Sequence, residues 1–102
     1  MTTVERIIPA DTPPGIVALH LKRYQFAREH TVGKQVLDIA CGVGYGSLHL
    51  AEACKQVVGA DIDWAAVDYA RQQYAGRENL AFVQADAMRT GLAESQFDAV
   101  CS

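Results

Sequence analysis

The sequence feature that most constrains the fold is a cluster of three glycines directly after an apolar run. Residues 36–47 read VLDIACGVGYGS, with an acidic residue at position 38 and with Gly42, Gly44 and Gly46 at alternate positions. Glycine loses more conformational entropy on folding than any other residue, so such a cluster indicates a tight turn or the close approach of a ligand to the backbone. A strand that runs through a glycine-rich turn into a helix is where open α/β sheets bind their ligands.

Short β-rich runs alternate with helical stretches around this cluster. A leading helix is predicted over 16–30, where apolar residues recur at helical spacing after the breaker sequence ADTPPG. Alternation of strands and helices is typical of βαβ units, so the chain is predicted to be an α/β protein with a parallel sheet. The predicted strands are 35–40, 56–61, 80–86 and 97–102, the helices between them are 46–54 and 64–75, and 87–96 is a predicted loop.

Two common nucleotide-binding loops do not fit the glycine cluster. A P-loop requires GxxxxGK[ST], but Ser47 stands five positions after Gly42 and no lysine follows. A dinucleotide-binding fold requires GxGxxG, and Ser47 again occupies the position of the third glycine. A phosphate-binding P-loop is therefore excluded, and binding of NAD is disfavoured.

Composition excludes several further classes. The chain has 102 residues, half of them apolar, and a formal net charge of -3 with its basic residues scattered. This suffices for one small domain and gives no basic surface for nucleic acid. No apolar stretch approaches the roughly 18 residues that cross a bilayer, and the N-terminus lacks the features of a signal peptide. We expect a cytoplasmic protein with a small-molecule or protein partner, without nucleic-acid or membrane binding.

The cysteines and histidines give no sign of a metal site. Three cysteines, far apart in the sequence, fit neither a disulfide framework nor a zinc site, so they are expected to be buried, reduced thiols. Scattered histidines are most often surface or core residues, and no catalytic role is assigned to them. The residues concerned are Cys41, Cys54, Cys101, His20, His30 and His49.

Four segments together resemble a known family. VLDIACGVGYGS, VVGADID, LAFVQADAM and FDAVCS resemble, in order and spacing, the segments of class I S-adenosylmethionine-dependent methyltransferases of the type 11 group. The leading segment HLKRYQFA is similar to the helix before the first strand in some of these enzymes. The resemblance implies a Rossmann-like, doubly wound sheet in the spatial order 3-2-1-4 with helices on both faces, S-adenosyl-L-methionine as cofactor, and methyl transfer to an acceptor that the sequence does not identify.

The resemblance also implies a division of the chain. Residues 1–34 are expected to be an N-terminal segment with the leading helix, and residues 35–102 the cofactor-binding half of a methyltransferase domain. In the family, three more strands and the acceptor pocket follow a segment such as FDAVCS. We therefore expect a fold truncated after the fourth strand, inactive alone, whose bare apolar edge favours self-association. The alternatives are a non-catalytic binding remnant of the same fold and another transferase that uses this cofactor.

A carboxylate for the ribose hydroxyls is expected at the end of the second strand. Asp61 lies 19 residues after Gly42, close to the roughly 20 that such a site requires. Asp63 is the rival, although it precedes a helix and is better placed to cap it. Ile62 would offer an apolar face to the adenine. Asp86 resembles the family acid that accepts from the adenine amino group, with the N–H of Ala87 facing ring nitrogen N1, unless Asp86 only begins a turn.

The remaining candidates surround the glycine loop. Gly42 and Gly44 would let the backbone approach the methionyl group, with Ala40 beside them, and Gly46 would open the next helix. By resemblance, Asp38 braces the loop and reaches the ammonium group of the ligand, or it braces or caps only. An aromatic ring favours a cation, so two tyrosines are candidates for the sulfonium, with core packing as the alternative. They are Tyr24 and Tyr45.

Overall fold

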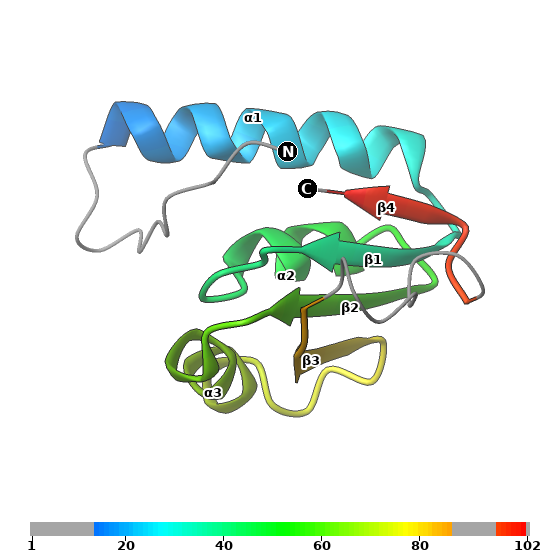
Figure 1. Ribbon diagram of the computed structural model, residues 1–102. Coiled ribbons are helices and arrows are strands. Elements are labelled where there is room, and N and C mark those ends of the chain that lie inside the picture. Colours follow the sequence, from blue (N-terminus) through cyan, green and yellow to red (C-terminus); the bar gives the residue numbers. More distant parts are fainter. Residues whose placement is uncertain (1–13, 87–95, 102) are drawn as a thin grey trace.

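The computed structural model describes residues 14–86 and 96–101, with side chains described from residue 19 onward. Three helices and four strands follow one another along these residues (Figure 1). They are α1 (Pro14–His30), β1 (Gln35–Ile39), α2 (Tyr45–Ala51), β2 (Gln56–Asp61), α3 (Trp64–Gln73), β3 (Leu80–Gln84) and β4 (Ala99–Cys101).

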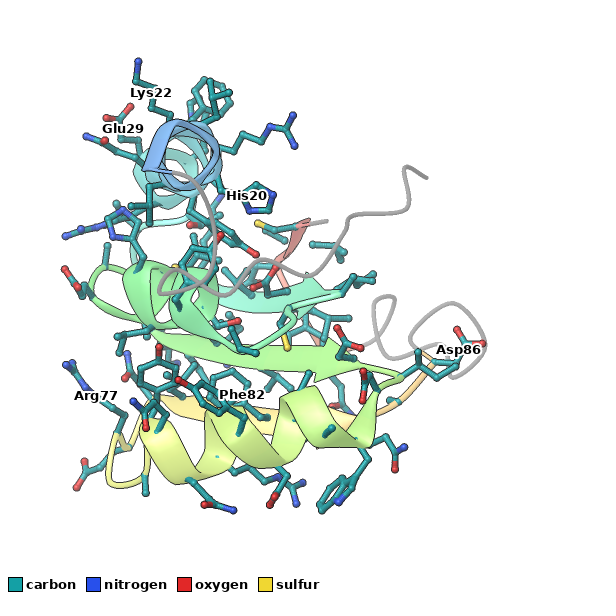
Figure 2. The ribbon with its side chains drawn as sticks, turned by 90° about the vertical axis from the view of Figure 1, so that its left-hand side faces the viewer. His20, Lys22, Glu29, Arg77, Phe82 and Asp86 are labelled. Carbon is teal, nitrogen blue, oxygen red and sulfur yellow. The ribbon has the colours of Figure 1, made fainter. Side chains whose placement is uncertain are left out.

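The strands form one parallel sheet in the order β3-β2-β1-β4, which confirms the predicted order. β1 is central: Val36 pairs with Val57 of β2, and Leu37 pairs with Val100 of β4. All four strands therefore end at the same edge, on the left in Figure 1, and Figure 2 looks onto this edge. The chain leaves this carboxyl edge of the sheet at the glycine loop after β1.

The described helices pack on one face of the sheet. Alternate strand residues, such as Val36 and Val57, point to this face and form one core cluster with Leu50 of α2 and Val67 of α3. Tyr24 and Ala27 of α1 pack against the same cluster. Helices were predicted on both faces; among the described residues the second face carries only the cluster of Leu37 and Ala60 with partly buried Ile39, Val58, Val83 and Phe97. The predicted loop 87–96 falls outside the described residues except for its last position.

The elements differ from their predicted bounds mainly at their ends. α2 was predicted over 46–54, but it begins one residue earlier, with Gly44 as its left-handed N-cap at φ 94°. It ends at Ala51 because the Asn79 side chain donates to the carbonyls of Ala51 and Cys54, at 2.6 and 3.2 Å, and satisfies groups that a longer helix would use itself. The third and fourth strands are shorter than predicted, and α1 begins two residues earlier.

The cysteines are unpaired, as predicted. Cys41 and Cys54 are buried, and Cys101 is partly buried. Burial raises the pKa of the Cys41 thiol, which keeps it in the unreactive thiol form. In the described part of the chain, no helix is long and apolar enough to span a membrane.

Candidate functional site

The turn after β1 has a left-handed backbone, and Asp61 holds it in place. Ala40 and Gly42 both have φ 58°, a conformation that favours glycine and that Ala40 adopts at an exposed position. One carboxylate oxygen of Asp61 accepts from the Gly42 N–H at 2.9 Å, and the other accepts from the Asp63 N–H at 2.9 Å. The structure thus brings together Gly42 and Asp61, which the sequence predicted to share a site.

Asp61 and Asp63, the two candidates for the ribose contact, have different roles in the structure. Asp63 is the N-cap of α3, and its side chain accepts from the Ala65 N–H at 2.9 Å, which confirms its predicted capping role. Ile62, between the two acids, is 70% exposed at the carboxyl edge. Asp61 itself is only partly buried, so its oxygens remain within reach of a ligand at this edge.

Asp38 lies behind the glycine loop and is only 1% exposed. It accepts from the Ser47 hydroxyl at 2.6 Å and from the Tyr24 hydroxyl at 3.2 and 3.3 Å. Burial raises the pKa of Asp38 to about 7, although both hydroxyl donors act to lower it. These contacts show the predicted bracing role, since Asp38 joins β1 to α2 and to α1, while contact with a ligand ammonium stays a prediction.

Two glycines of the loop leave room for aromatic rings of the protein itself. A Cβ on Gly46 would collide with the ring of Tyr24, and a Cβ on Gly44 would lie 2.8 Å from the ring of Phe82 and 2.9 Å from the Cβ of Ala70. Phe82 lies between α3 and the sheet (Figure 2). A side chain at position 44 would therefore point into the core. Glycine is favoured there because of this close packing and because of the positive φ.

The ring of Tyr24 packs on the core, whereas Tyr45 contacts His20, a histidine to which the sequence assigned no role. The Tyr45 hydroxyl is hydrogen-bonded to Nδ1 of His20 at 2.9 Å, and the rings of Tyr24 and Tyr45 lie 6.2 Å apart, edge to face. Burial and the neighbouring Arg23 lower the pKa of His20. The sequence contained one indication that His20 lies near these tyrosines: His20 and Tyr24 are four residues apart and so share a face of α1.

Asp86 follows β3 at the same edge of the sheet, where Figure 2 labels it. The Ala85 N–H donates to the Asp61 carbonyl at 3.1 Å, which ties the end of β3 to the end of β2. Ala87 lies outside the described residues, so its predicted role stays a prediction, as does that of Asp86. Residues 14–86 and 96–101 contain no group of three or more side chains that could hold a metal ion.

Comparison with known proteins identifies relatives of this arrangement. The family described as "Methyltransferase domain" matches residues 36–102. The chain is 37% identical over 68 residues to a demethylmenaquinone methyltransferase from Clavibacter sepedonicus, covering 67% of this chain and 28% of that protein. It is 35% identical over 86 residues to a 23S rRNA (uracil(747)-C(5))-methyltransferase from Yersinia pseudotuberculosis, covering 82% of this chain and 23% of that protein. The chain thus spans about a quarter of the length of these relatives.

Solved structures show the same fold. The N-methyltransferase NodS from Bradyrhizobium japonicum, in complex with S-adenosyl-L-homocysteine, superposes with a TM-score of 0.73 at 22% identity, over 88% of this chain and 45% of that one. A dimethyladenosine transferase from Plasmodium falciparum superposes with a TM-score of 0.66 at 28% identity, over 87% of this chain and 31% of that one. The Rossmann-like α/β fold expected from the sequence is therefore confirmed.

Proposed function

The chain belongs to the methyltransferase domain family, and on that premise we propose that it binds S-adenosyl-L-methionine at the carboxyl edge of its sheet for methyl transfer to an acceptor. One observation carries this proposal: Asp61, at the end of β2, is hydrogen-bonded to the backbone of the glycine loop after β1 and is still partly exposed. A single carboxylate thus lies where a ligand lying across the ends of both strands would meet it.

The residues at this edge suit the chemical groups of the cofactor. Each oxygen of Asp61 accepts one backbone N–H, and an ionised carboxylate has about four acceptor positions, so it retains capacity for two ribose hydroxyls. The exposed Ile62 offers an apolar surface of the kind on which an adenine ring packs. Asp38 lies behind the loop, and above its pKa of about 7 it places a negative charge there that favours the methionyl ammonium group on the other side of the loop.

The protein contributes position rather than the reactive group. The cofactor supplies an activated methyl group on a sulfonium, and the residues of the chain bind it, orient it and exclude water. Fixing two reactants in place can lower a barrier by about 7 to 11 kcal/mol, so a rigid loop has a direct catalytic value. Asp61 restrains the loop through the Gly42 N–H, and Asp38 joins β1 and α2, the two elements that the loop connects.

The acceptor is not assigned by the relatives. Their names give demethylmenaquinone in one case and a uracil of 23S rRNA in the other, which are unlike in size and charge. We propose a small-molecule or protein acceptor, since the net charge of -3 disfavours a polyanion. The alternative, a non-catalytic binding protein of the same fold, would hold the cofactor equally well and transfer no methyl group.

Calorimetric titration of the chain with S-adenosylmethionine and with S-adenosylhomocysteine tests the proposal. We expect both to bind, and we expect Asp61→Ala to weaken binding by about 1.5 to 3 kcal/mol, the contribution of hydrogen bonds that involve a charged group. Asp63→Asn is the matched control, because asparagine caps a helix as well as aspartate does and should leave affinity unchanged. Absence of binding to the folded wild-type chain would overturn the proposal. If Asp63→Asn loses affinity and Asp61→Ala does not, Asp63 rather than Asp61 contacts the ribose.

A further inference from the structure

His20 is a titratable residue of α1 to which the proposed function gives no role. Its ring lies among aromatic rings, 6.3 Å from that of Tyr45 and 6.5 Å from that of Tyr24. Nδ1 is hydrogen-bonded to the Tyr45 hydroxyl at 2.9 Å, whereas Nε2 has no hydrogen-bond partner among the described residues. One ring nitrogen is therefore held by Tyr45, and no residue in the described part of the chain is hydrogen-bonded to the other.

The position of His20 along α1 puts it toward the carboxyl edge of the sheet. α1 runs in the direction opposite to β1, as Figure 1 shows, and Tyr24 reaches Asp38 near the end of β1. His20 lies four residues before Tyr24, about one helical turn or 5 to 6 Å further in the direction in which β1 ends. This places it beside the glycine loop, where Tyr45 directly follows the left-handed Gly44. Figure 2 shows the ring of His20 projecting from α1 above the sheet.

We propose that His20 is the catalytic residue that accepts the proton of the methyl acceptor, an inference that rests on the proposed function. The acceptor is then an O–H or N–H nucleophile. As its oxygen or nitrogen forms a bond to the methyl carbon, the carbon–sulfur bond breaks and sulfur keeps that electron pair. The O–H or N–H bond breaks, and its proton passes to Nε2 of His20.

The hydrogen bond to Tyr45 is compatible with this task in one tautomer of the ring. Nε2 accepts a proton only if the proton of the neutral ring is on Nδ1, which then donates to the oxygen of Tyr45; in the other tautomer the Tyr45 hydroxyl donates to Nδ1. Among the described residues, the charged groups near His20 are Arg23 on its own helix and Asp38, whose carboxylate accepts from the hydroxyl of the neighbouring Tyr24. Burial and Arg23 both favour the neutral ring, which is the form that accepts.

Three ligands test the position of His20 without knowledge of the acceptor. They are S-adenosylmethionine, S-adenosylhomocysteine and the cofactor analogue in which a carbon that bears an amine replaces the methylated sulfur. The amine stands where the methyl group would be, so a neutral His20 should accept from it through a water molecule in the place of the acceptor atom. At pH 7.5 we expect His20→Phe to weaken the amine analogue about tenfold relative to S-adenosylhomocysteine, while His30→Phe, on the exposed end of the same helix, does not.

Nitrogen-15 spectra of the histidine rings give a second measurement, the position of the ring proton and its response to the ligand. A purely structural role of His20 would not produce such a response. We expect the His20 ring to carry its proton on Nδ1 in the wild-type chain, and Tyr45→Phe to abolish this preference while keeping the aromatic packing. The amine analogue should shift the Nε2 resonance. If its affinity relative to S-adenosylhomocysteine is the same in wild type and His20→Phe, or if Nε2 carries the proton, the inference is overturned. If none of the three ligands binds the wild-type chain, the proposed function fails instead.

Discussion

Replacing Asp38 by Asn removes an ionisable group from the interior and should abolish the pH dependence that this group imposes on stability. Asp38 is 1% exposed, and its pKa is raised from 3.8 to about 7. The folded chain therefore binds a proton at position 38 more tightly than the unfolded chain does. Its stabilising effect is complete below about pH 4 and is lost as the pH rises through 7.

The size of the effect follows from the shift in pKa. About three pKa units at 1.36 kcal/mol each give about 4 kcal/mol, of which about 2 to 3 kcal/mol falls between pH 5 and pH 8. Asparagine cannot ionise, so Asp38→Asn should lack this term. The free energy of unfolding of the variant, relative to wild type, should therefore rise by about 2 to 3 kcal/mol between pH 5 and pH 8.

Urea unfolding of both chains at several pH values measures this difference, and contributions from the other titrating groups cancel in it. Ser47→Ala is an informative second variant, because loss of the Ser47 donor should raise the pKa of Asp38 further and move the loss of stability to higher pH. A free energy of unfolding of Asp38→Asn that, relative to wild type, stays constant or falls from pH 5 to pH 8 would refute the reasoning.

Two other substitutions test the packing of α1 and the edge of the sheet. Gly46→Ala should destabilise the chain by about 1 to 3 kcal/mol in urea unfolding, since its methyl group meets the ring of Tyr24, and Tyr24→Ala should cost less in the Gly46→Ala background than in wild type. Equal costs in both backgrounds would contradict that contact. Val100→Lys, at a 44% exposed position of β4, should lower self-association in sedimentation equilibrium, because a charge on an edge strand opposes strand addition. If the proportions of monomer and oligomer are unchanged in Val100→Lys, any self-association uses a surface other than β4.

The parts of the site that follow from local chemistry could be predicted from the sequence. The spacing of Gly42 and Asp61, the cap at Asp63 and the parallel order of the strands all depend on short motifs and on the handedness of βαβ units. The pairing of Tyr45 with His20 and the collision of a Cβ at Gly46 with Tyr24 depend instead on how α1 lies against α2. That position results from packing between segments 20 or more residues apart, and no local pattern fixes it.

The three-way contact at Asp38 has a consequence for how sequences of this kind can change over time. The residues come from three different elements and depend on one another: the hydroxyls of Tyr24 and Ser47 donate to Asp38, and the carboxylate of Asp38 is their acceptor. An apolar residue at 38 would leave the buried Ser47 hydroxyl and the partly buried Tyr24 hydroxyl without their acceptor, and loss of either hydroxyl would leave the carboxylate with less compensation. The three positions should therefore vary together among related chains, as one inherited unit rather than as three independent sites.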